Sequence, residues 1–157
     1  MNSAIQGSLA GLVATAPMSL AMRAGEKLIP LHNKGHLPPR QVTDGLLSKL
    51  GWLKFLRREH RETAALVAHY GFGAAAGALV GLTAARTSTV PKPVTGAAVG
   101  VFVWAASYLG WLPAIDIRKN MLGEPAERNL QMIAAHIVWG AAAGALLEAM
   151  NRQTQQS

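Results

Sequence analysis

Two histidines are the residues of this chain whose type and setting could support chemistry. His69 opens the stretch HYGFGAAAGALVG and His136 opens HIVWGAAAGALLE, and the two stretches are identical at eight of thirteen positions. Each histidine lies inside a long apolar segment. An ionisable side chain in such a segment, if it spans a membrane, is a functional hypothesis by default. Because imidazole titrates near neutral pH, a facing pair could form a proton relay or a pH sensor.

The same pair has two other interpretations. A neutral, buried histidine that donates one hydrogen bond to a backbone carbonyl is the plainest of them. Two histidines on facing helices could also ligate haem or a metal ion, but the chain has no Cys and no acidic side chain accompanies them. We therefore expect no metal site and no cofactor, with haem held by His69 and His136 as the minor alternative.

Three charged residues near the ends of apolar segments are further candidates for binding protons or ligands. Arg23 is expected to extend to the lipid head groups, and Glu148 is expected to be solvated at the far end of its segment. Asp116, just beyond another segment, could pair with Arg40 or Arg118. No Gly-rich phosphate loop, Ser-His-Asp set or HExxH motif is present. We therefore expect that the chain is not an enzyme.

The elements that must position these residues follow from four apolar segments. They cover residues 4–22, 63–85, 94–112 and 129–150, and about 20 residues suffice for a membrane-spanning helix. Only 15% of the 157 residues are charged, against about 25% in soluble domains. The sequence predicts one all-α integral membrane domain of four transmembrane helices. The first segment has no preceding Lys or Arg and no convincing cleavage site, so we expect a retained span.

Small residues recur every four positions along these segments. Such spacing places them on one side of a helix, which is the usual surface for close helix–helix approach in lipid. We expect this glycine-zipper packing within the chain or between copies of it. The glycines concerned are Gly7, Gly11, Gly73, Gly77, Gly81, Gly96, Gly100, Gly140 and Gly144.

A polar, basic stretch separates the first two segments. Residues 32–40 are expected to be irregular, because Gly35 and the pair Pro38-Pro39 disfavour a helix. Residues 42–58 are amphipathic and predict an interfacial helix whose basic side chains meet anionic head groups, or a helix packed on the ends of the bundle. In the third segment, Tyr108 and Trp111 suit an interfacial aromatic belt.

The distribution of basic residues predicts the orientation in the membrane. Of the 15 Lys and Arg residues, twelve lie in or beside the connections 23–62 and 113–128. These connections should be cytoplasmic, with both termini outside. Topology accounts for the net charge of +7, so we expect no nucleic-acid partner. The two halves then share one orientation, which predicts two parallel two-helix repeats related by an axis along the membrane normal.

Three short motifs resemble those of the YagU-like family of uncharacterised bacterial inner-membrane proteins. The first is Leu37-Pro38-Pro39-Arg40, and the last surrounds His136, Trp139 and Gly140. The resemblance implies a multi-span helical bundle in the inner membrane, and a link to acid stress has been suggested for that family. The middle motif contains Trp104, Ser107, Tyr108, Trp111 and Pro113.

Two functions are consistent with these features. The first is a small transport or pH-responsive membrane protein, linked to protons or a solute and centred on His69 and His136. The second is a non-catalytic structural subunit or assembly factor that binds another membrane protein or a second copy of itself. The matched histidines favour the first, and the small size and glycine spacing favour the second.

Overall fold

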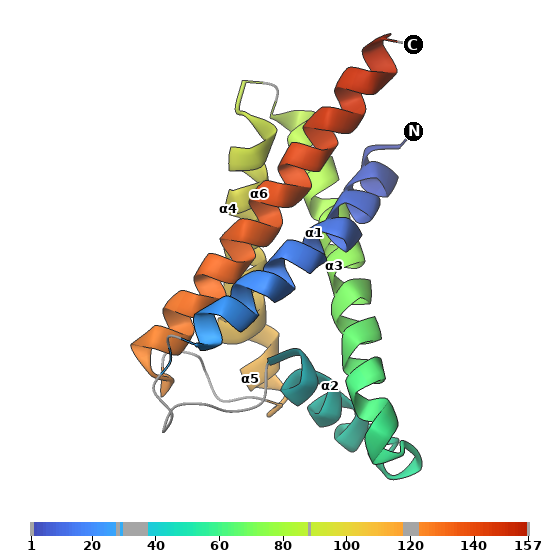
Figure 1. Cartoon of the computed structure of the whole chain (residues 1–157), viewed down its shortest axis with the longest axis vertical. Coiled ribbons are helices and arrows are strands. Elements are labelled where there is room, and N and C mark those ends of the chain that lie inside the picture. Colours follow the sequence, from blue (N-terminus) through green and yellow to red (C-terminus); the bar gives the residue numbers. More distant parts are fainter. Residues whose placement is uncertain (1, 28, 30–37, 88, 118–122, 157) are drawn as a thin grey trace.

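The computed structural model describes residues 2–27, 29, 38–87, 89–117 and 123–156, and within these ranges it contains helices and no strand. Figure 1 shows the α-helices in chain order. They are α1 (Ser3–Glu26), α2 (Pro38–Lys49), α3 (Arg61–Arg86), α4 (Lys92–Ala105), α5 (Leu112–Ala114) and α6 (Ala126–Gln156). Two 3₁₀ turns (Leu53–Phe55 and Arg58–His60) precede α3, and a π-helical segment (Ala106–Trp111) joins α4 to α5.

Four helices of the described chain are long and apolar enough to cross a membrane. Their bounds are Ser3–Glu26, Arg58–Arg86, Lys92–Ala114 and Ala126–Gln153. The expectation of an all-helical chain with four span-length apolar helices is therefore confirmed. Each of these helices extends a few residues beyond the predicted apolar segment, because polar residues continue the helix at its ends. The arrangement is compatible with a multi-pass membrane protein.

The helix ends follow local sequence signals. The Asn2 side chain caps α1 by accepting a hydrogen bond from the Ala4 N–H at 2.9 Å, as Asn commonly does at this position. At the end of α3, the Arg86 guanidinium donates to the Leu82 carbonyl at 3.2 Å, which satisfies one of the last carbonyls. Pro91 caps α4 and Pro93 lies in its first turn, where the missing N–H has no cost.

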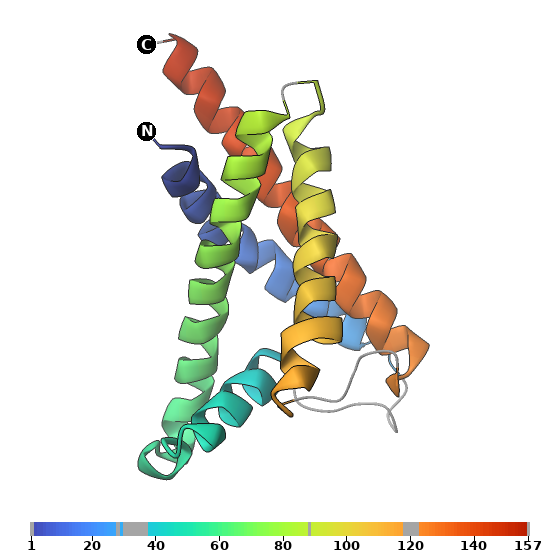
Figure 2. The same ribbon diagram turned by 180° about the vertical axis from the view of Figure 1, so that it is seen from behind.

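The long helices run between two ends of the molecule. Both ends of the described chain and the connection between α3 and α4 lie at one end, which we call the termini end (Figures 1 and 2). The short helices α2 and α5 lie at the other, the α2 end. The helices pack mainly in the pairs α1–α3, α4–α6 and α1–α6. Figure 2 shows α3 and α4 adjacent near the termini end and separated near the α2 end.

Glycines occupy the crossing of α1 and α3. A methyl group added to Gly77 would overlap the Gly7 carbonyl oxygen, and one added to Gly11 would overlap the Gly73 carbonyl oxygen. Gly81 packs on Gly7 in the same way. The two backbones therefore meet with no room for a side chain between them, which is how small residues bring membrane helices together.

A second glycine crossing joins α4 to α6. A methyl group added to Gly96 or Gly140 would overlap the carbonyl oxygen of the other. Gly100 lies against the His136 carbonyl and Gly144 against the Lys92 carbonyl. All nine glycines of the four-residue spacing therefore lie at these two crossings. The close helix–helix approach that they permit is between helices of one molecule.

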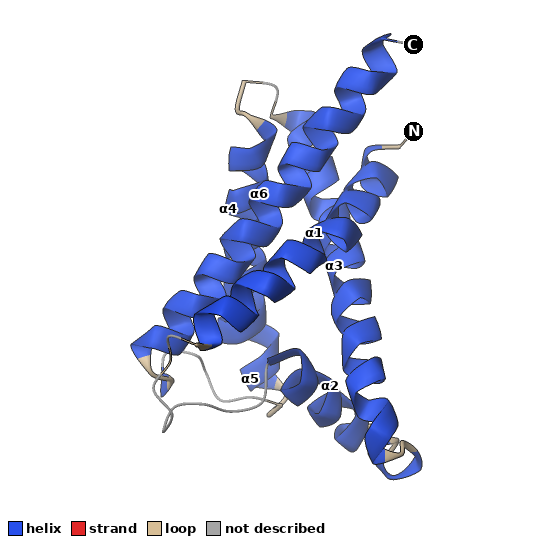
Figure 3. Ribbon diagram, in the orientation of Figure 1, coloured by secondary structure: helices blue, strands red, loops and turns tan. Residues whose placement is uncertain are grey.

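The expectation of an irregular chain up to Arg40 is wrong for its last three residues. Pro38, Pro39 and Arg40 form the first turn of α2, shown as a helix in Figure 3. A proline pair is acceptable there because the first-turn N–H groups of a helix have no intrahelical partner. Residues 32–37 of that stretch lie outside the described residues.

The amphipathic segment 42–58 is not one helix. The α-helix ends at Lys49, and Gly51 follows with a φ of 71°, a left-handed conformation that glycine adopts without steric cost. The two 3₁₀ turns come after it. The amphipathic helix is therefore shorter than predicted and begins earlier, at the proline pair.

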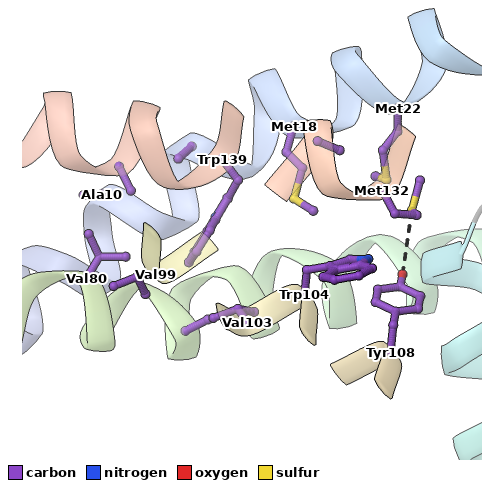
Figure 4. Close-up of a cluster of buried hydrophobic side chains, with 14 of the residues drawn as sticks. Ala10, Met18, Met22, Val80, Val99, Val103, Trp104, Tyr108, Met132 and Trp139 are labelled. Carbon is purple, nitrogen blue, oxygen red and sulfur yellow. Dashed lines mark hydrogen bonds between the residues drawn. The ribbon is translucent and has the colours of Figure 1, made fainter. Parts of the chain in front are cut away.

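The predicted end of the third segment also differs from the structure. Tyr108 is 7% exposed, so it belongs to the core and not to a peripheral aromatic belt, while Trp111 is partly exposed. The Tyr108 hydroxyl donates to the Met132 sulfur at 3.8 Å, drawn in Figure 4. The helical chain continues two residues past the predicted end at Leu112, and Pro113 lies in this last turn, within α5. Gly96, Gly100 and Trp104 are buried at intervals of four residues, and Tyr108 continues the same side of the helix into the core.

Candidate functional site

A cavity of about 190 Å³ lies between the helices in the half of the molecule nearer the α2 end, and both His69 and His136 line it. Its walls come from α1, α2, α3, α6, and the segment from α4 to α5. The chain thus brings together two residues that are 67 positions apart in sequence. Most of the other lining side chains are apolar, and they include Met18, Met22 and Phe72.

His136 is held in a fixed orientation at the cavity. It is 5% exposed, and its Nδ1 atom lies 2.7 Å from the Met132 carbonyl oxygen. Since a carbonyl oxygen can only accept, Nδ1 carries the proton and Nε2 is the acceptor of the neutral ring. The ring of Tyr108 meets that of His136 edge to face, with centroids 5.9 Å apart, a favoured aromatic geometry.

His69 is half-buried, and its hydrogen bonding is incomplete. Its Nε2 atom is shielded from solvent and has no hydrogen-bond partner in the described part of the chain. Its ring meets that of Tyr70 edge to face, with ring centroids 6.2 Å apart. Buried polar atoms in proteins almost always have a partner, so an exception at a cavity calls for a functional explanation.

Three hydroxyl groups around the cavity are already occupied. Thr15 donates to the Gly11 carbonyl at 2.8 Å, and Thr43 donates to the Pro39 carbonyl at 2.8 Å. Tyr108 donates to the Met132 sulfur. Imidazole is the side-chain group of the cavity whose unperturbed pKa lies nearest neutral pH, and each of the two rings has a ring nitrogen left for chemistry.

Helix α2 forms the floor of the cavity. Its residues Pro39, Val42, Thr43 and Leu46 contribute to the lining. Arg40 holds α2 against the start of α3 through an ion pair with Glu62, and it also pairs with Asp44 at 3.7 Å. Arg40 is also one of the two predicted partners of Asp116, and these ion pairs engage it elsewhere. The other predicted partner, Arg118, lies outside the described residues.

The opposite side of the cavity is closed by packing. Trp139 is 2% exposed, and its indole N–H donates to the Gly11 carbonyl at 3.0 Å. Beyond it toward the termini end, Ala10 and Val80 are buried. Figure 4 shows the Trp139 side chain extending from α6 toward the core residues of α3 and α4. The cavity is thus closed toward the termini end.

The π-helical segment is the part of the site that the sequence did not indicate. The Leu112 N–H bonds to the Ser107 carbonyl, five residues earlier, and Ser107, Tyr108 and Trp111 all line the cavity. Single π-helical turns are frequent at functional sites. The crowding of Trp104, Tyr108 and Trp111 is the nearest sequence signal, but such crowding is equally typical of an interfacial belt.

The other charged candidates lie away from this cavity. Arg23 is exposed on α1 near the α2 end, and Glu148 pairs with Arg152 on α6 toward the termini end. Asp116 is exposed and has a φ of 49°, a conformation that Asp tolerates better than most residues. Among the described residues, no three His, Asp or Glu side chains gather as a metal site.

Trp139 and Trp104, two tryptophans near the cavity, differ in one hydrogen bond. This difference predicts how much stability each loses when it is replaced by Phe. Trp139→Phe should cost about 1 kcal/mol more unfolding free energy than Trp104→Phe. Both residues are buried, but the Trp104 indole N–H has no partner in the described chain, so its loss removes no bond. Unfolding in dodecyl maltoside with added sodium dodecyl sulfate measures both. Equal costs would show that the bond to Gly11 contributes nothing.

Comparison with known proteins adds no family. No protein-family model matches this chain, and no curated protein or solved structure is significantly similar to it.

Proposed function

We propose that this chain is a small multi-pass protein of a bacterial inner membrane, and that it carries out a proton- or solute-linked process, transport or a pH response, at His69 and His136. The observation that carries the proposal is that both histidines line one cavity between span-length apolar helices. Ionisable groups inside a membrane segment typically mark proton or solute pathways. The resemblance to the YagU-like family supports the same setting.

The proposed orientation places the α2 end in the cytoplasm. The basic residues of the two connections at that end support it. Exposed Lys49, Lys54, Arg57 and Arg58 are then positioned to meet anionic head groups. The two-helix repeat is part of the proposal as well, and the contacts Gly11–Gly73 and Gly96–Gly140, which use aligned glycines of the two matched stretches, support it.

The arrangement of the two rings allows simple proton chemistry. With Nδ1 of His136 bonded to Met132, its Nε2 atom can accept a proton from a bound molecule or a water. His69, in the same cavity, has an unsatisfied nitrogen of its own. Because both imidazoles line one cavity, a proton taken up by one can pass to the other through a molecule bound in that cavity.

Replacing the histidines tests the proposal. In proteoliposomes, His69→Gln combined with His136→Gln should abolish proton or solute flux that depends on pH, while the protein stays folded, because Gln keeps hydrogen bonding but does not titrate near neutral pH. His60→Gln is the matched control, since His60 is exposed and outside the cavity. Flux that survives the double replacement at every pH would contradict the proposal.

A second function, as a structural subunit or assembly factor, is favoured by the closed side of the cavity. Trp139 and the glycine crossings leave a tightly packed region between the cavity and the termini end. A binding role needs no passage through this region, whereas transport needs the helices to part. Native mass spectrometry of gently extracted protein distinguishes the two, since this role requires a defined complex with another membrane protein or a second copy.

A further inference from the structure

Aromatic and sulfur-containing side chains form a large part of the lining of the cavity that contains His69 and His136. Aromatic rings pack against one another in edge-to-face or offset geometry, and methionine sulfur makes favourable contacts with ring edges. Such a lining suits a flat ring better than a flexible chain. The residues are Met18, Met22, Phe72, Tyr108, Trp111 and Trp139.

The size of the cavity fits one ring. A dry cavity of about 150 Å³ lined by apolar side chains is known to bind benzene, and the cavity here measures about 190 Å³. A six-membered ring with one polar substituent fills this space. The hydroxyls of Thr15, Thr43 and Tyr108 already donate within the chain, so they do not donate to the substituent of the ring.

The state of His136 decides which polar substituent fits. Its Nδ1 donates to the Met132 carbonyl, so Nε2 accepts. A hydroxyl on the ring can donate to Nε2, whereas an ether or ketone oxygen cannot. The unsatisfied nitrogen of His69 is compatible with a hydroxyl in either tautomer, because a hydroxyl both donates and accepts.

The mouth of the cavity faces the outer surface of the helices and not the termini end. Ala68, Phe72 and Trp111 line the cavity and are also exposed. They come from α3 and the π-helical segment, on the side where α3 and α4 separate in Figure 2. In a bilayer this opening admits molecules dissolved in the lipid, and an alkyl substituent of the ring can remain in the lipid outside.

We infer that this cavity binds a membrane-soluble phenol, with its ring among the aromatic side chains, its hydroxyl donating to Nε2 of His136 and any alkyl tail leaving between Phe72 and Trp111. The inference rests on the membrane setting of the proposed function, and it names the class of molecule that the same site takes. A phenol hydroxyl on an imidazole is also a route for proton exchange at the site.

Photo-cross-linking of the full chain in phosphatidylcholine nanodiscs tests the inference. The probe is a 4-alkylphenol with a diazirine in its alkyl chain, and the sites of labelling are mapped by mass spectrometry. Labels should fall on cavity-lining residues of α3 and the π-helical segment. Unlabelled 4-pentylphenol should compete about five to ten times better than 4-pentylanisole at equal concentration in the bilayer, because the anisole cannot donate a hydrogen bond.

Two further variants test where the phenol binds. His136→Leu should remove the preference for phenol over anisole. Ala68→Phe should reduce labelling at least fivefold by filling the mouth, whereas Ala75→Phe should not, since Ala75 is exposed on the same helix but does not line the cavity. Because Ala68 is already exposed, its replacement does not overpack the core.

The outcomes separate this inference from the proposed function. Equal competition by 4-pentylphenol and 4-pentylanisole, or labelling that Ala68→Phe leaves unchanged, would overturn the phenol site even if the histidine variants lose flux. Specific labelling in a protein that shows no flux would support the phenol site and count against transport.

Discussion

Gly77→Ala should destabilise the protein by about 3 kcal/mol, whereas Gly71→Ala on the same helix should leave it unchanged or up to about 1 kcal/mol more stable. A methyl group on Gly77 would overlap the Gly7 carbonyl oxygen and would lie 2.8 Å from the Gly11 Cα atom. Both neighbours are backbone, so no side chain can rotate away. The helices must separate along the whole crossing to admit one carbon atom.

Gly71 is the matched control because it differs from Gly77 only in what it faces. Nothing lies within 4 Å of a methyl group added there, and the residue is exposed. Reversible unfolding of both variants in dodecyl maltoside with increasing sodium dodecyl sulfate gives the two free energies. If Gly77→Ala unfolds at the same detergent ratio as Gly71→Ala, the close crossing of α1 and α3 is not what holds the bundle together.

The crossings show what a periodic sequence reveals. A spacing of four residues identifies one side of a helix, and the glycines at 7, 11, 73 and 77 show which sides pack together. Hydropathy likewise identifies the long helices, because about 20 apolar residues are needed to span a bilayer. Both signals are contained in one segment of the sequence, so they can be recognised without knowing which helix packs against it.

The cavity could not be derived in this way. It depends on where α3 and α4 separate, on α2 closing the α2 end and on the Trp139 indole bonding to Gly11, which is 128 residues away. The π-helical segment has no periodic signature, although Ser107, Tyr108 and Trp111 within it line the cavity. The matched histidines indicated a shared site, but only the contact of Nδ1 with Met132 assigns the acceptor nitrogen.

Labelling of single cysteines should give an all-or-none result for the proposed orientation. The chain has no Cys, so each introduced thiol is unique. In intact spheroplasts, a membrane-impermeant maleimide should label Thr89→Cys nearly completely and Lys54→Cys only at background. Thr89 lies in the connection between α3 and α4, and Lys54 lies in a 3₁₀ turn at the α2 end. Both are exposed, so accessibility within the protein does not separate them.

Permeabilised cells provide the control, because both cysteines should then react. The physical reason is that Lys and Arg are retained on the cytoplasmic side, and the two connections at the α2 end carry most of them. If Lys54→Cys is labelled in intact spheroplasts and Thr89→Cys is not, the protein has the opposite orientation in the membrane. The floor formed by α2, with the half of the molecule that holds the cavity, would then lie at the outer face of the membrane. The pattern of labelling therefore decides near which face of the membrane His69 and His136 lie.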